Sequence, residues 1–202
     1  QIALNGFASL VSSLKSSYPD IIIDDSHVLY GDGCHDSDNY LYGPGIVEPF
    51  SSDGHGITWG LEEKKIVLDA GAFLSIDSIE EVQNDNAILT PHLGEFRKLF
   101  NIKKSDPIDI HLFNSIQSKL NGKIVILKSL NAFIITKDMV YIMDMGPSIL
   151  ATAGTGDVLS GILVSLLSQG YSRLEASILG TYLHAEAANY YMNNISKDGM
   201  TA

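Results

Sequence analysis

The sequence predicts an α/β fold: a mostly parallel sheet with helices on both faces. Short, continuous apolar runs at 66–68 and 124–127 are typical of strands that are buried on both sides. Segments with helical spacing of apolar residues alternate with these runs, as expected when crossover helices join parallel strands. A third observation is that polar residues follow several of the strands, at the sheet edge where such folds bind ligands.

The strands are predicted from apolar or β-branched runs bounded by turn residues. The last two form a hairpin that turns at Lys137-Asp138. In chain order, the predicted strand segments are 21–23, 41–42, 66–69, 87–90, 124–127, 132–136 and 139–143.

The helices are predicted at 5–14, 94–100, 108–120, 157–169 and 173–192. Leu10 and Leu14 lie one turn apart in the first. The helix 157–169 is the best specified, because an apolar stripe runs along it and Gly170 follows as a stop signal. The polar, acidic stretch 31–39 is predicted to be a solvated loop without metal-ligand spacing.

Length and composition favour one folded domain over residues 1–202, with 45% hydrophobic and 18% charged residues. The net charge of −11 argues against general nucleic-acid binding, which needs a basic surface. Cys34 is the only cysteine, so no internal disulfide can form and a cytoplasmic location is expected. No apolar run is long enough to span a membrane, and no signal peptide is visible at the start of the sequence.

The most informative stretch is 153–161, Ala-Gly-Thr-Gly-Asp-Val-Leu-Ser-Gly, which begins the helix predicted at 157–169. Glycines let the backbone expose its N–H groups, and a helix start adds partial positive charge, so this stretch is suited to bind phosphate. Asp157 would then lie beside that anion, placed to accept a proton from an attacking hydroxyl. The alternative is that Asp157 is only a helix cap or first-turn acid.

Three further polar elements follow predicted strands, and each has an alternative interpretation. The Gly-Pro-Gly segment at 43–45 either allows close approach to a ligand or is an ordinary turn. His92 either contacts a ligand or is a surface or capping residue. Lys128 either reaches a nucleotide or extends from the sheet into water. Their shared position at one sheet edge favours the functional interpretations.

In this order, five segments resemble the ADP/ATP-dependent NAD(P)H-hydrate dehydratases, which are ribokinase-like proteins often labelled carbohydrate kinases. The segments are 43–45 (Gly-Pro-Gly), 67–70 (Val-Leu-Asp-Ala), 89–96 (Leu-Thr-Pro-His-Leu-Gly-Glu-Phe), 125–128 (Val-Ile-Leu-Lys) and 151–161. The segment 182–184 (Tyr-Leu-His) also looks like the family's late helix. The last motif is shared with other ribokinase-like kinases, whereas the element at 90–96 is more specific.

The resemblance implies a ribokinase-like three-layer sandwich that repairs hydrated NADH or NADPH. The hydrate hydroxyl would be phosphorylated from ADP or ATP, with Mg²⁺ neutralising phosphate charge, and phosphate would then leave. Asp157 would be the base, expected to be ionised because it lies at a helix N-terminus. The substrate would contact Gly45, His92 and Asp157. The nucleotide and phosphate would contact Lys128, Ser129, Leu130, Asn131, Ala132, Gly154, Thr155 and Gly156. The resemblance implies a homo-oligomer and identifies no metal ligands.

The sequence departs from the family pattern at several positions. Leu93 stands in place of a second proline, Gly71 in place of an aspartate, and 129–132 in place of a glycine-containing segment. The family's early Lys-Gly and glycine-rich segments are not visible before residue 40, and the first residue is Gln1, so we expect either a missing N-terminal part or a reduced relative. The open alternatives are another ribokinase-like kinase, acting on a vitamin precursor or sugar-like alcohol, and a non-catalytic nucleotide-binding relative.

Overall fold

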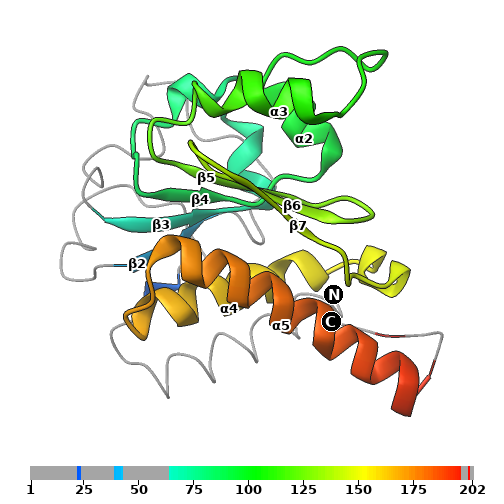
Figure 1. Cartoon of the computed structure of the whole chain (residues 1–202). Coiled ribbons are helices and arrows are strands. Elements are labelled where there is room, and N and C mark those ends of the chain that lie inside the picture. The colour runs from blue at the N-terminus through cyan, green and yellow to red at the C-terminus, as the bar shows by residue number, and fades with distance from the viewer. Residues whose placement is uncertain (1–21, 24–38, 43–63, 197–199, 201–202) are drawn as a thin grey trace.

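The computed structural model describes residues 22–23, 39–42, 64–196 and 200. Its sheet has seven strands that lie side by side in sequence order (Figure 1). The first five strands are mutually parallel, and the last two form antiparallel pairs at one end of the sheet. The strands are β1 (Ile22–Ile23), β2 (Asn39–Tyr42), β3 (Lys65–Leu68), β4 (Ala87–Leu89), β5 (Ile124–Leu127), β6 (Ala132–Ile135) and β7 (Val140–Met143).

Helices cover both faces of this sheet, so the described part of the chain has three layers (Figure 1). One face carries α2 (Leu93–Leu99) and α3 (Ile110–Gln117), together with the short 3-10 helices η1 (Ala70–Leu74) and η2 (Ile79–Glu81). The other face carries α4 (Thr155–Ser168) and α5 (Arg173–Asn194), which follow a third 3-10 helix, η3 (Ser148–Ala151). The predicted α/β class with helices on both faces is therefore confirmed.

The alternation of side chains along each strand creates two hydrophobic cores. Ile66 and Leu68 of β3 face the α2–α3 layer, and Val67 between them faces the α4–α5 layer. All three are fully buried, which explains why the strand is apolar at every position.

The core beneath α2 and α3 is centred on Phe96. Its ring lies 5.0 Å from that of Phe100 and 6.5 Å from that of Phe113, in tilted and edge-on arrangements that aromatic pairs favour. On the opposite face, α4 and α5 approach closely at Gly180, where a Cβ atom would lie 2.9 Å from Leu163 Cδ2. A glycine at this point lets the two helices pack against each other and the sheet.

The predicted elements between 64 and 196 are present, with ends shifted by a few residues. The helix predicted at 157–169 begins two residues earlier, at Thr155, and α3 is shorter than the predicted 108–120. The three 3-10 helices were not predicted. The helix predicted at 5–14, residues 31–38 of the acidic loop predicted at 31–39, and the Gly-Pro-Gly segment at 43–45 lie outside the described residues. Asn39, the last residue of that predicted loop, begins β2 instead.

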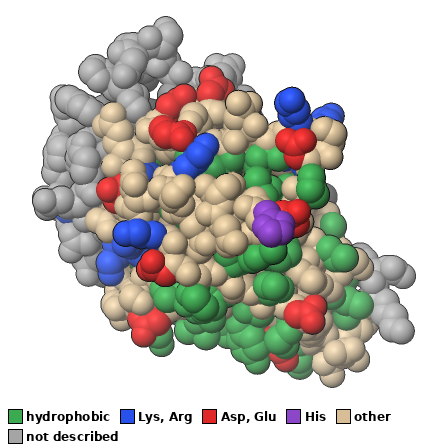
Figure 2. Space-filling model, turned by 45° about the horizontal axis from the view of Figure 1, so that its top comes forward, with side chains coloured by type: hydrophobic (Ala, Val, Ile, Leu, Met, Phe, Trp, Pro, Cys, Tyr) green, Lys and Arg blue, Asp and Glu red, His purple; other side chains and the backbone are tan. Residues whose placement is uncertain are grey.

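Some large hydrophobic side chains stay at the surface. Figure 2 shows hydrophobic side chains gathered over the lower part of one face, with acidic ones among them. Most of the exposed large hydrophobics follow β5 in the sequence, with Leu130 the most exposed at 82%. Within the described residues, no helix combines the length and the apolar character needed to cross a membrane.

Candidate functional site

The start of α4 has the geometry of an anion-binding helix N-terminus. Gly154 occupies the N-cap position with a φ of 90°, a left-handed conformation that glycine adopts without a steric penalty. No side chain caps this end, and the N–H of Thr155 donates to the carbonyl of Thr152 at 3.3 Å, which leaves the N–H groups of Gly156 and Asp157 for an anion. Thr155 instead turns its hydroxyl away, donating to the carbonyls of Leu150 (2.6 Å) and Thr152 (2.8 Å). The helix start is therefore suited to hold an anion.

Asp157 lies in the first turn of α4, three residues after the N-cap. Because Gly154 is the N-cap, the interpretation of Asp157 as a helix cap is wrong, whereas its position as a first-turn acid is confirmed. The pKa of Asp157 is raised, first by burial and then by the negative charge of Asp69, and Lys128 offsets part of this effect. This direction is opposite to the lowering that the helix N-terminus alone would give. A raised pKa makes this carboxylate a stronger base.

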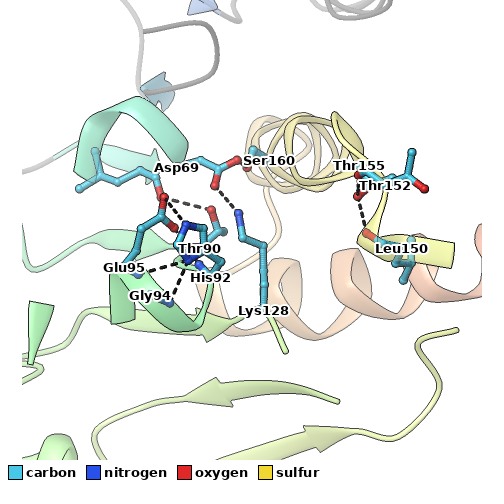
Figure 3. Close-up of polar contacts among 11 residues, drawn as sticks. Asp69, Thr90, His92, Gly94, Glu95, Lys128, Leu150, Thr152, Thr155 and Ser160 are labelled. Carbon is cyan, nitrogen blue, oxygen red and sulfur yellow. Dashed lines mark hydrogen bonds and ion pairs between the residues drawn. The ribbon is translucent and has the colours of Figure 1, made fainter. Parts of the chain in front are cut away.

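Lys128 and Asp69 form an ion pair beside this helix start (Figure 3). The ammonium group of Lys128 donates to Asp69 Oδ1 at 2.6 Å, and Ser160 on α4 donates to Asp69 Oδ2 at 2.7 Å. Lys128 therefore does not extend into water at the end of β5, as one interpretation of the sequence proposed. Its side chain turns toward the carboxylate that ends β3.

Gly156 shows how close this ion pair is to the anion site. A Cβ atom on Gly156 would lie 3.2 Å from Lys128 Nζ and 3.8 Å from Asp69 Oδ2. The ammonium group therefore packs against the first turn of α4, next to Asp157. The positive charge of Lys128 and the partial positive charge of the helix N-terminus therefore lie next to each other.

His92 lies at the same sheet edge, since it pairs with Lys128 in a parallel bridge at the ends of their strands. It is also the N-cap of α2: its Nδ1 accepts from the N–H groups of Gly94 (2.9 Å) and Glu95 (3.2 Å). Glu95 completes a capping box by accepting from His92 N at 2.8 Å. The capping interpretation of His92 is therefore confirmed. With Nδ1 used as an acceptor, the proton of the neutral ring resides on Nε2.

The His92 ring is also open to a ligand. Its side chain is 63% exposed, and Nε2 lies 3.4 Å from Glu95 Oε1. Burial raises the pKa of Glu95, against the lowering effects of its hydrogen bond to His92 and of the nearby cations. The cap uses Nδ1, whereas Nε2 faces Glu95 Oε1, so a ligand that binds Nε2 would share it with that carboxylate.

The predicted nucleotide segment follows β5 directly at this edge. Ser129 donates its hydroxyl to the carbonyl of Asn131, which fixes a tight turn, and Leu130 projects from it. Ala132 already belongs to β6. The structure thus brings Lys128, the turn at 129–131, His92 and the α4 start to one edge, whereas Gly45 lies outside the described residues.

Asp69, Ser160 and His184 belong to this site but were not among its predicted residues. Asp69 ends an apolar strand and lies within the 67–70 motif, so its position was a usable signal. His184 lies in the 182–184 segment on α5, which packs against α4. Burial lowers the pKa of His184, although its hydrogen bond to the backbone of Thr155 acts in the opposite direction. Its contact with Thr155, at the start of α4, is a tertiary contact that sequence patterns do not reveal.

No group of three His, Cys, Asp or Glu side chains that could hold a metal ion occurs within the described residues. A cavity of about 450 Å³ lies beside α2 and is lined by side chains such as Arg97 and Lys98. Both of these cations are already engaged, Arg97 with the carbonyl of Asp106 and Lys98 with Asp77. We therefore place the candidate site at the strand ends, where side chains of complementary chemistry converge.

Comparisons with known proteins show which family this chain resembles. A family model described as NAD(P)H-hydrate dehydratase matches residues 56–202. The bifunctional NAD(P)H-hydrate repair enzyme Nnr of Helicobacter pylori is 36% identical over 141 residues, which is 66% of this chain and 30% of that protein. The ADP-dependent (S)-NAD(P)H-hydrate dehydratase of Neisseria meningitidis is 30% identical over 191 residues, which is 90% of this chain and 64% of that protein.

Among solved structures, the ADP/ATP-dependent NAD(P)H-hydrate dehydratase of Bacillus subtilis, co-crystallised with ATP and Mg²⁺, superimposes with a TM-score of 0.65. It is 22% identical, and the match covers 82% of this chain and 60% of that one. This likeness shows the fold. The chain spans less than two thirds of the length of each of these three relatives.

Proposed function

The chain belongs to the NAD(P)H-hydrate dehydratase family, and on this premise we propose that it restores NADH or NADPH from the hydrated cofactor, with ADP or ATP as phosphoryl donor. One observation carries the proposal: Asp157 lies in the first turn of an uncapped helix, with the ammonium group of Lys128 packed against that turn. The names of the relatives supply the substrate and the nucleotide.

Asp157 would act as the general base. It would take the proton of the hydrate hydroxyl while the hydroxyl oxygen attacks the terminal phosphorus of the nucleotide. Its raised pKa supports this role, because a carboxylate with a higher pKa holds the transferred proton more strongly. The leaving nucleotide is AMP when ADP is the donor and ADP when ATP is the donor.

The N–H groups left free at the start of α4 and the ammonium group of Lys128 would stabilise the negative charge that spreads over the transferred phosphoryl group. The phosphate would then leave with the electrons of the C–O bond. Loss of a proton from the neighbouring carbon restores the ring double bond. The turn at 129–132 would contact the nucleotide beside Lys128.

His92 would bind the substrate through the Nε2 side of its ring, because Nδ1 is used to cap α2. An Nε2–H group is a hydrogen-bond donor, which suits the carbonyl oxygen of a nicotinamide carboxamide. Gly45 would contribute to the same substrate contact.

Mg²⁺ would come with the nucleotide. The described residues contain no group of acidic or histidine side chains able to hold the ion by themselves. This fits the general behaviour of Mg²⁺ at nucleotide sites, where phosphate oxygens and water supply most ligands. When bound there, the ion would neutralise phosphate charge.

The test is to incubate the chain with NADH hydrate, Mg²⁺ and either ADP or ATP, and to follow the return of reduced-nicotinamide absorbance. The Asp157→Asn variant should lower the rate by at least about 100-fold, the usual scale for a general base. Asp138→Asn is the matched control, because Asp138 is an exposed aspartate in the β6–β7 turn.

A folded wild-type chain that restores no absorbance with either nucleotide would contradict the proposal. In that case, phosphorylation of other small alcohols would identify a related kinase activity. Nucleotide binding without turnover would instead identify a non-catalytic relative.

A further inference from the structure

Asp69 is a buried carboxylate at the junction of three elements. It directly follows β3, and the residue as a whole is 0% exposed. Both of its carboxylate oxygens accept hydrogen bonds. One donor, Lys128, comes from the end of β5, and the other, Ser160, comes from the second turn of α4 (Figure 3). These donors lie 59 and 91 positions away in the sequence, so only the folded chain brings them together.

Burying an unpaired carboxylate raises the free energy of the folded state. Replacing a buried ion pair by well-packed apolar side chains often leaves a protein equally stable or more stable. A pair kept in such a place therefore calls for a role other than stability. The partially exposed end of this pair indicates the role: the Lys128 side chain is 26% exposed, whereas that of Asp69 is 1% exposed. The pair holds an ammonium group, not a carboxylate, at the rim of the site.

A second ion pair in the chain shows the opposite arrangement. Lys123 and Asp85 are 2.7 Å apart, but there the lysine side chain is 4% exposed and the aspartate is 60% exposed. These residues precede β5 and β4, so they lie at the other edge of the sheet. The two pairs are alike in distance and differ in which charge they place at the surface.

We propose that Asp69 is a positioning residue for phosphoryl transfer. It holds the ammonium group of Lys128 against the first turn of α4, and its bond from Ser160 fixes it to the same helix. Nucleotide phosphate bound at the helix start would thus meet a cation whose position is already set. This inference rests on the proposed function for its reaction and on the Asp69 contacts for its geometry.

The first experiment compares Asp69→Asn with Asp85→Asn, which removes the negative charge from the other pair. Asp69→Asn should lower kcat/KM for the nucleotide by at least about tenfold, because the ammonium group is no longer held by a charged partner. Asp85→Asn should stay within about twofold of the wild type. Equal losses in the two variants would overturn the proposal, since they would show a general effect of losing an ion pair.

A double-mutant cycle tests whether Asp69 acts through Lys128. In a Lys128→Gln background, Asp69→Asn should change kcat/KM by no more than about twofold. Independent, multiplicative losses would overturn the proposal. Ser160→Ala keeps both charges and should give a smaller loss of kcat/KM. If Asp69→Asn does not fold, Ser160→Ala takes its place in this comparison.

A measurement on the ligand-free chain separates this proposal from the proposed function. NMR detection of the Lys128 ammonium group should show slow hydrogen exchange in the wild type and in Asp85→Asn, and fast exchange in Asp69→Asn. An unchanged Lys128 signal in Asp69→Asn would overturn the positioning role. Failure of the wild type to restore NADH would contradict only the proposed function.

Discussion

The surroundings of Asp157 raise the pKa of the residue that we propose as the base. Burial and the negative charge of Asp69 both raise its pKa, so the folded chain disfavours the ionised form that a base requires. Lys128 offsets part of that effect. The neighbours of Asp157 thus make it a stronger base and leave the folded state carrying an unfavourable charge.

This environment predicts the pH dependence of turnover. Since Asp157 must be unprotonated to act as a base, kcat/KM should fall as the pH decreases through its raised pKa, at a higher pH than an ordinary aspartate would give. Rates measured across the acidic range check this. The residual kcat/KM of Asp157→Asn should no longer fall as the pH decreases. A fall that remains in this variant would reflect the titration of another group.

The same shift predicts an effect on stability. A carboxyl group whose pKa is raised by folding stabilises the native state at low pH, and this contribution is lost as the pH rises through the folded-state pKa. Asp157→Asn should therefore have a melting temperature at neutral pH equal to or above that of the wild type. A clearly lower melting temperature would mean that the carboxylate makes a structural contact.

His92 caps α2, and the substrate contact proposed for it is a second role that two substitutions can separate from the cap. His92→Ala removes the N-cap of α2 and should lower the free energy of unfolding by about 1 kcal/mol. His92→Asn should keep the cap, because asparagine is a favoured N-cap residue. Both variants should raise the KM for the hydrate. If His92→Asn restores both stability and KM, His92 is a cap only.

At the level of elements, the sequence predicted what local patterns determine. Apolar runs located β3, β4 and β5, and the stripe after Gly154 located α4. The 3-10 helices were missed because each spans only three to five residues, too few to show a helical period of apolar residues. The Asp69–Lys128–Ser160 contacts were missed for a different reason, since strand order and helix docking bring these residues together. The sequence predicted at which edge of the sheet the site lies, but it did not predict which side chains pair with one another there.

The glycine that begins α4 gives a test at this scale. Gly154 and Gly170 have nearly identical φ values of 90° and 91°, and a Cβ on Gly170 would meet no atom within 4 Å. Alanine at either position should lower the free energy of unfolding by about 1–2 kcal/mol through backbone strain. Only Gly154→Ala should also lower turnover, because it distorts the anion-binding turn. Equal turnover in both variants would contradict that role.

At the level of the whole molecule, stability comes from two cores separated by one sheet. Phe96→Ala would leave a cavity in the core beneath α2 and α3, and should lower the free energy of unfolding by about 3–5 kcal/mol. Ile110→Ala is the control, since Ile110 is 55% exposed and should change stability by no more than about 0.5 kcal/mol. Denaturant titration of the two variants measures both values. A small effect of Phe96→Ala would mean that the core refills the space.

The placement of α4 and α5 over one whole face of the sheet has a consequence for protein synthesis. During translation, the strands emerge before these two helices, so Val67, Ile88 and Ile126 face solvent until the later segment leaves the ribosome. A nascent chain that ends before Thr155 would present this bare apolar face to chaperones. Asp157 lies on α4, one of the two helices that cover this face. The proposed base therefore reaches its position in the same folding step that completes the core.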